Sequence, residues 1–228
     1  MSHLAGHPPS TREGLAAVLF DMDGTLVDSE KLWDRSLADL AAELGGTLSP
    51  AVRSSMVGSN LTRSITLLLT DVHSDADPEW AGGWLLDRTR TYFAAGLTWR
   101  TGAEELLLCV RDAGLPTALV TSTHRSLTEI GLDTLGRDRF DVVVCGDEVA
   151  HAKPNPEPYR KAAAALGVDP RQSVAIEDSP TGVAAARSAG CPTIAVPHVV
   201  PIESAPGVLV VGSLAEIDLE VLSGLVAR

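Results

Sequence analysis

The chain has 228 residues, of which 45% are hydrophobic, enough for one packed core with an inserted module but short of two full domains. Its formal net charge of −12 argues against nucleic acid or an anionic membrane as a partner. No apolar run approaches the length of a membrane span, and residues 1–14, expected to form a flexible tail, lack a signal peptide's apolar core. Cys109, Cys145 and Cys191 are odd in number and lie in apolar segments, which suits a reducing cytoplasm and no disulfide framework.

A short apolar run breaks off into two acids near the start of the chain, in LAAVLFDMDGTLVDSE. Ala16–Phe20 predicts a buried parallel strand, which puts Asp21 at the strand's carboxyl end, where open α/β sheets bind ligands. Gly24 allows the chain to turn there with its amides pointing inward. We expect Ser29 to cap the helix that follows.

The next segment contains no convincing strand. Lys31–Leu44 repeats apolar residues at helical spacing, a shorter helix is expected after the Ser-Pro pair, and GSNLTRSITLLL and Glu79–Ala95 predict two more. Residues 32–97 are therefore expected to form an all-helical cap. It interrupts a core made of residues 15–31 and 98–228.

Strands and helices alternate in the rest of the chain. The expected strands are Leu115–Val120, Asp141–Cys145, Ser173–Ile176, Thr193–Val196 and Val208–Val211. The expected helices are Ala103–Ala113, Leu127–Leu135, Pro156–Leu166, Pro180–Ala189 and Leu214–Val226. This alternation predicts an α/β fold with a doubly wound, Rossmann-like parallel sheet core and an inserted all-helical cap subdomain.

Polar residues follow each of the first four predicted strands. They are Asp21 and Asp23, then Thr121 and Ser122, then Lys153, then Glu177 and Asp178. A polar turn explains any one of these segments, but it explains poorly a set that combines acids, hydroxyls and a lysine. Because the carboxyl ends of parallel strands share one edge, the set is expected to meet around a divalent cation and a phosphate.

The same segments resemble the four motifs of the haloacid dehalogenase superfamily, in order and at suitable spacing: DMDGTLVDSE, the apolar run into TST, the lysine of HAKPNPEPY, and the acidic pair of IEDSPTG. The helical insert resembles that superfamily's helical-cap branch, which includes β-phosphoglucomutase-like proteins and sugar-phosphate phosphatases. The resemblance implies a Mg²⁺-dependent phosphohydrolase acting on a small phosphorylated metabolite, with a sugar phosphate as the expected substrate. A monomer or weak dimer is expected.

The resemblance also implies roles for the motif residues. Asp21 would attack phosphorus and form an aspartyl phosphate, and Asp23 would protonate the leaving alkoxide and later take a proton from water. The carboxylates of Asp21 and Asp178 and the backbone carbonyl of Asp23 would bind Mg²⁺, with Glu177 acting through water. The residues expected around the phosphate are Thr121, Ser122, Lys153, Met22 and Asp23. Loss of Lys153 is expected to harm catalysis more than folding.

Substrate choice is expected to lie in the cap. The candidate substrate-binding residues are Ser59, Asn60, Arg63, Arg88 and, from the core, Arg125. Each of these residue types is, taken singly, more often a solvated surface group. Asp28 is interpreted as a helix-start or hinge residue, and Asp147 as either a partner of the site or a surface turn acid.

Other activities fit the sequence less well. Phosphomutases of this branch usually carry a histidine where this chain has Trp33, which favours hydrolysis over mutase activity. Hydrolytic dehalogenation needs no cation and would leave Glu177 and Asp178 unexplained. A phosphonate hydrolase would need a cap lysine for a Schiff base, and Leu32–Leu97 contains none. A non-catalytic phospho-acceptor module would need neither the insert nor Asp23.

Overall fold

The computed structural model describes residues 14–226, so the predicted tail lies outside the described residues except for Gly14. A six-stranded, fully parallel sheet forms the centre of the molecule, with the strand order β3-β2-β1-β4-β5-β6. The strands are β1 (Ala17–Phe20), β2 (Thr117–Val120), β3 (Val142–Val144), β4 (Ser173–Glu177), β5 (Thr193–Ala195) and β6 (Val208–Val210). The predicted α/β fold with a parallel sheet is confirmed.

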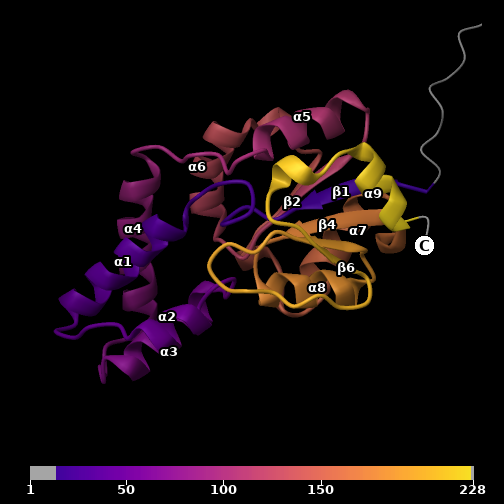
Figure 1. Ribbon diagram of the computed structural model, residues 1–228. Helices are drawn as coiled ribbons and strands as arrows, with labels where there is room; N and C mark the ends of the chain where they lie inside the picture. Colours follow the sequence, from indigo (N-terminus) through magenta and orange to yellow (C-terminus); the bar gives the residue numbers. More distant parts are fainter. Residues whose placement is uncertain (1–13, 227–228) are drawn as a thin grey trace, which may run out of the picture.

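Helices cover both faces of this sheet (Figure 1). The core helices are α5 (Ala103–Asp112), α6 (Arg125–Leu135), α7 (Glu157–Leu166), α8 (Pro180–Ala189) and α9 (Leu219–Val226). Successive side chains of a strand point to opposite faces. Accordingly, Val18 and Phe20 pack into a hydrophobic cluster with α5, α6 and α9, whereas Ala17 and Leu19 pack into a second cluster with α7 and α8.

Four further helices lie beyond the carboxyl ends of the strands, on the left in Figure 1. They are α1 (Glu30–Glu43), α2 (Pro50–Ser55), α3 (Leu61–Asp71) and α4 (Pro78–Phe93). They share a separate hydrophobic cluster, which includes Leu40, Ile65, Leu68 and Leu85. The cap boundaries at residues 31/32 and 97/98 stay predictions.

Two local predictions are wrong. The predicted helix Leu214–Val226 is split into a short 3₁₀ helix, Leu214–Glu216, and α9. The reason is Asp218, whose carboxylate accepts hydrogen bonds from the backbone N–H groups of Glu220 and Val221 and so begins α9 separately. Ser29 stands at the start of α1, but its side chain does not cap that helix.

Helix ends elsewhere follow the expected capping chemistry. The Ser179 side chain accepts a hydrogen bond from Gly182 N at 3.0 Å, with Pro180 as the first residue of α8. Within residues 14–226, no helix is both long enough and apolar enough to cross a bilayer.

Candidate active site

The site begins with the pairing of β1 and β4 at the centre of the sheet. Phe20 lies opposite Ile176, and the backbone N–H of Asp21 donates to Ile176 O at 3.0 Å. The chain winds outward in one direction from β1 through β2 to β3, and in the other from β4 through β5 to β6. Asp21 and Glu177 therefore emerge side by side at the point where the winding reverses, which is where such sheets form ligand sites.

Lys153 joins these two acids. Its ammonium nitrogen lies 2.7 Å from Asp21 Oδ1, 2.6 Å from Glu177 Oε1 and 2.8 Å from the carbonyl oxygen of Val120. Three acceptors match the three N–H donors of an ammonium group, and the lysine is buried. Burial alone lowers the pKa of Lys153, but the carboxylates of Asp21 and Glu177 outweigh it and raise that pKa, so the side chain stays charged.

Two hydroxyls also donate hydrogen bonds to Glu177. Tyr159 donates to Glu177 Oε1 at 2.6 Å, and Ser179 donates to Glu177 Oε2 at 3.2 Å. Tyr159 comes from α7, which packs on one face of the sheet, and is fully buried. Glu177 is thus fixed by groups from three segments and has little freedom to move.

Asp21, Glu177 and Asp178 each place a carboxylate oxygen within 4.8 Å of the others. Asp178 Oδ2 is buried and has no hydrogen-bond partner among the described residues. Gly24, at φ +76°, lies so close to this oxygen that a Cβ at position 24 would collide with it. An unsatisfied carboxylate oxygen in an all-oxygen cluster fits a hard cation such as Mg²⁺.

Burial also changes the proton affinity of this cluster. It raises the pKa of Asp21, with Glu177 and Asp23 adding to the effect and Lys153 opposing it. Burial likewise raises the pKa of Asp178 well above its usual range, and the charges of Asp21 and Glu177 reinforce this rise. A divalent cation would relieve the repulsion between these carboxylates.

Asp23 has four hydrogen-bond donors around its carboxylate. Ser29 Oγ at 2.6 Å and Trp33 Nε1 at 3.0 Å donate to Oδ1, and Thr123 Oγ1 at 2.7 Å and Thr121 Oγ1 at 3.3 Å donate to Oδ2. The predicted Ser29 cap is not formed, because the backbone of Ser29 is helical, with φ −93° and ψ −12°, and not extended as in a capping residue, and its hydroxyl donates to Asp23 instead.

The other residues predicted around the phosphate, Thr121, Ser122 and Met22, differ in the contacts that they make. Thr121 accepts a hydrogen bond from Thr123 N at 3.0 Å, and Ser122 donates to the cap carbonyl Gly58 O at 3.3 Å. Met22 has a fully buried side chain, and its carbonyl accepts the N–H groups of the turn that follows, beginning with Thr25.

A cavity separates this edge of the sheet from the cap. Its lining residues come from both parts: Asp21, Asp23, Glu30, Trp33, Leu37, Arg53, Met56, Gly58, Ser59, Leu61, Ser64, Leu85, Leu86, Thr121, Ser122, Thr123, His124, Lys153, Asp178 and Ser179. The cavity volume is about 70 Å³. Pockets for small ligands commonly measure several hundred Å³, so this cavity is small by comparison.

The candidate substrate residues of the cap separate into two groups. Ser59 lines the cavity and shares a 2.7 Å hydrogen bond with Ser64. Asn60 accepts from Arg63 N and caps α3, and Arg63 is exposed. Arg88 pairs with Asp39 at 2.6 Å. Among the described residues that line the cavity, Asn60, Arg63 and Arg88 are absent.

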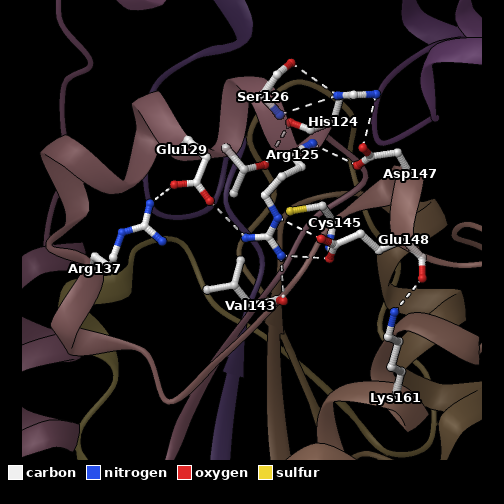
Figure 2. Close-up of polar contacts among 11 residues, drawn as sticks. His124, Arg125, Ser126, Glu129, Arg137, Val143, Cys145, Asp147, Glu148 and Lys161 are labelled. Carbon is white, nitrogen blue, oxygen red and sulfur yellow. Dashed lines mark hydrogen bonds and ion pairs between the residues drawn. The ribbon is translucent and has the colours of Figure 1, made fainter.

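Arg125 is not among the residues that line the cavity, and its guanidinium lies in a network of polar contacts with acidic side chains (Figure 2). Its guanidinium donates to Glu148 at 2.7 and 2.8 Å and to the carbonyl of Val143 at 2.9 Å. Asp147 accepts from Arg125 N at 2.8 Å and lies 3.1 Å from His124 Nε2, so it holds the start of α6 and the cavity-lining histidine. Arg125 is therefore a structural residue in this arrangement.

Asp28 lies where the chain passes between core and cap. Its carboxylate contacts Lys31 at 2.7 Å and His198 at 3.2 Å, and its N–H donates to Thr98 O at 2.9 Å. The hydrogen bond from Lys31 is the main reason that the pKa of Asp28 is lowered.

Several lining residues were not predicted to bind anything: Glu30, Arg53, Ser64, Thr123 and His124. Thr123 and His124 directly follow the predicted Thr121–Ser122 pair, so continuing that motif by two residues would have found them. Arg53 left no comparable signal, because it reaches the cavity only through the place that α2 takes in the folded cap, where its side chain pairs with Glu30 and Asp34 of α1.

Comparison with known proteins agrees with this geometry. A phosphoglycolate phosphatase of Chromobacterium violaceum is 34% identical over 210 residues, which cover 89% of this chain and 95% of that protein. Hexitol phosphatase B of Escherichia coli is 33% identical over 196 residues, covering 82% and 86%. Among solved structures, CbbY from Rhodobacter sphaeroides in complex with phosphate has a TM-score of 0.82 at 29% identity, covering 91% and 99%.

A family model described as haloacid dehalogenase-like hydrolase matches residues 18–196, which contain all four predicted motifs. The chain belongs to the haloacid dehalogenase-like hydrolase family.

Proposed function

We propose that this hydrolase is a Mg²⁺-dependent phosphatase that cleaves the phosphate monoester of a small metabolite, a sugar phosphate, through an aspartyl phosphate on Asp21. The observation that carries the proposal is the unsatisfied oxygen of Asp178, which lies buried beside Asp21 and its partner Lys153. The names of the relatives, phosphoglycolate phosphatase and hexitol phosphatase, support phosphate ester hydrolysis.

In the first step, an oxygen of Asp21 attacks phosphorus in line with the leaving oxygen. The Asp21–phosphorus bond forms, the bond from phosphorus to the sugar oxygen breaks, and Asp23 gives its proton to the departing alkoxide. Lys153 offsets the negative charge gathered by the acids and the phosphoryl oxygens. The threonines around Asp23 keep its carboxyl directed into the cavity.

In the second step, water attacks the same phosphorus and loses a proton to Asp23. The Asp21–phosphorus bond breaks, phosphate leaves, and both carboxyls return to their starting states. One residue therefore acts first as acid and then as base, which requires that it hold one position throughout the cycle.

The carboxylates of Asp21 and Asp178 and the backbone carbonyl of Asp23 would hold Mg²⁺, with Glu177 acting through a water molecule. When bound, the cation supplies positive charge to the phosphoryl oxygens. The fit rests on the all-oxygen donor set and on the unsatisfied Asp178 oxygen.

Hydrolysis is favoured over phosphomutation by the residue at position 33. Trp33 donates a hydrogen bond to Asp23 from the position where mutases of this branch carry a histidine. A dependence on glucose 1,6-bisphosphate and formation of an isomerised product would indicate a mutase instead. Cytoplasmic location and a monomeric or weakly dimeric state stay predictions.

Phosphate release from p-nitrophenyl phosphate tests the proposal directly. The purified chain is expected to release phosphate with Mg²⁺ and to stop when EDTA is added in excess. Restoration of turnover by fresh Mg²⁺ controls for damage to the protein. Failure to release phosphate from p-nitrophenyl phosphate and from a panel of sugar phosphates, with intact folding by circular dichroism, contradicts the proposal.

A further inference from the structure

A partly buried ion pair in the cap forms part of the cavity wall. Glu30, the first residue of α1, and Arg53, on α2, have their Oε2 and Nη2 atoms 2.5 Å apart. Their side chains are 9% and 17% exposed, and both line the cavity. Arg53 also contacts the exposed carboxylate of Asp34 through Nε.

Fold stability does not account well for this pair. Removing two charges from water costs free energy that their attraction only partly returns, so apolar residues of similar size commonly stabilise a fold as well or better. Leu37 of α1 and Met56, which directly follows α2, already belong to the hydrophobic cluster of the cap. The position of the pair in the cavity wall points to ligand selection.

The charges around the cavity are unevenly shared. The lining contains four acids, Asp21, Asp23, Glu30 and Asp178. It contains one arginine, Arg53, and one lysine, Lys153. Lys153 is bound to Asp21 and Glu177, and Arg53 is bound to Glu30 and Asp34. Both of these cations are therefore already paired with carboxylates.

This pairing acts differently on two kinds of leaving group. A leaving group with a second anion would meet Glu30 and would find the Arg53 charge already neutralised, an unfavourable arrangement in a partly dehydrated cavity. A hydroxyl can donate to Glu30 and accept from Arg53. Within residues 14–226, Arg53 Nη1 donates to no protein acceptor, so it can serve a ligand oxygen.

The remainder of this wall is uncharged. Ser59 and Ser64 present paired hydroxyls, and Leu61 and Leu85 present aliphatic side chains. Hydroxyl groups next to an aliphatic surface complement a polyol, which has alternating C–H and O–H groups.

We propose that the Glu30–Arg53 pair is the specificity determinant of this site, and that it selects phosphate monoesters with an uncharged, polyhydroxylated leaving group over those whose leaving group carries a carboxylate or second phosphate. The inference rests on the proposed phosphatase activity.

Steady-state kinetics with three substrates test the inference: sorbitol 6-phosphate, 2-phosphoglycolate and fructose 1,6-bisphosphate. We expect kcat/KM for sorbitol 6-phosphate to exceed the other two values by about tenfold or more. Turnover of p-nitrophenyl phosphate is measured in parallel. If no ester is hydrolysed, the proposed function fails. If esters are hydrolysed but 2-phosphoglycolate or the bisphosphate is preferred, only the specificity inference fails.

The variant Glu30→Gln removes the neutralising charge at nearly constant shape. The ratio of kcat/KM for 2-phosphoglycolate to that for sorbitol 6-phosphate is expected to rise about tenfold, because Arg53 then keeps only the exposed carboxylate of Asp34 as a partner and can attract an anion in the cavity. Asp87→Asn is the matched control: Asp87 pairs with Arg90 on the exposed face of α4, so its ratio should not change. An unchanged ratio in folded Glu30→Gln overturns the inference.

Arg53→Met gives a second reading if Glu30→Gln does not fold. Loss of the guanidinium is expected to raise KM for sorbitol 6-phosphate several-fold while KM for p-nitrophenyl phosphate changes little. If KM rises by the same factor for both esters, Arg53 has only a structural role in the cap, and the inference is refuted.

Discussion

Trp33 Nε1 lies 3.0 Å from Asp23 Oδ1 and donates a hydrogen bond to it across the boundary between cap and core. An indole N–H can donate but cannot accept, so Oδ1 must be an acceptor whether or not Asp23 carries a proton. The hydroxyls of Thr121 and Thr123 can rotate, so Oδ2 is the oxygen able to gain and lose the proton. Trp33 thereby selects which oxygen of Asp23 exchanges protons in the proposed mechanism.

The variant Trp33→Phe tests this positioning role. It keeps the edge-to-face contact with Phe93 but removes the N–H donor. We expect kcat to fall about 10- to 100-fold, the usual worth of a hydrogen bond to a charged group, with a smaller change in KM. Trp80→Phe, at an exposed tryptophan of α4, is the control and should match the unmodified protein.

Asp21→Asn should abolish turnover, because an amide is a poor nucleophile. The expected loss in kcat is more than about a thousandfold, measured as phosphate release with Mg²⁺. Asp133→Asn, on the exposed surface of α6, serves as the control for a carboxylate-to-amide change. Retained turnover in Asp21→Asn would assign the nucleophile elsewhere.

Lys153→Met should affect both stability and catalysis. Removal of the ammonium leaves Asp21 and Glu177 buried without their shared partner, which is expected to lower the free energy of unfolding by about 3 kcal/mol in urea titrations with EDTA. Phosphate release should fall below detection. Lys161→Met, at an exposed lysine that bonds Glu148 O, is the matched control.

The same Lys153 variant tests whether catalysis suffers more than folding. Mg²⁺ should restore part of the lost stability by replacing some of the missing positive charge, but it should not restore turnover. Recovery of both by Mg²⁺ would show that Lys153 is needed for assembly of the site and not for the reaction.

Stabilisation by Mg²⁺ should increase with pH. The pKa values of Asp21 and Asp178 are raised above the ordinary value of 3.8, so the folded chain binds these protons more tightly than the unfolded chain does. The contribution of these groups to stability is therefore present at low pH and is lost as pH rises from 3.8 through the raised values.

A cation competes with those protons, so it binds weakly at low pH and strongly at high pH. Thermal unfolding with and without Mg²⁺ should show a small increase in Tm at pH 5.5 and a larger one at pH 8. Adding Ca²⁺ in place of Mg²⁺ tests whether the effect depends on the ion. Equal Mg²⁺ effects at the two pH values would contradict the raised pKa values.

General rules of sheet architecture explain why the core was predictable. Residues Asp21, Lys153 and Asp178 are far apart in the sequence, but parallel strands deliver their ends to one edge, so a pattern of strands is enough to bring such residues together. The register of β1 against β4 follows from the buried apolar runs of both strands.

Contacts set by helix packing were not predictable in this way. The meeting of Glu30 and Arg53 depends on the angle between α1 and α2, which hydrophobic spacing does not define. A serine before a helix commonly caps it, which is the basis of the Ser29 prediction, but in the structure the hydroxyl of Ser29 donates to the nearby Asp23 carboxylate. A prediction from the local capping preference of a serine therefore fails where another segment of the chain places a strong hydrogen-bond acceptor next to it.

The central place of β1 and β4 also sets when the protein can become active during its synthesis. Asp21 leaves the ribosome early, whereas Glu177 and Asp178 follow only after the cap and three strands have been made. Until β4 pairs with it, β1 has an open edge and its acid lacks the neighbours that would hold a cation. Premature chain release before β4 thus yields a product that contains the proposed nucleophile, Asp21, but lacks Glu177 and Asp178, the other two acids of the cluster.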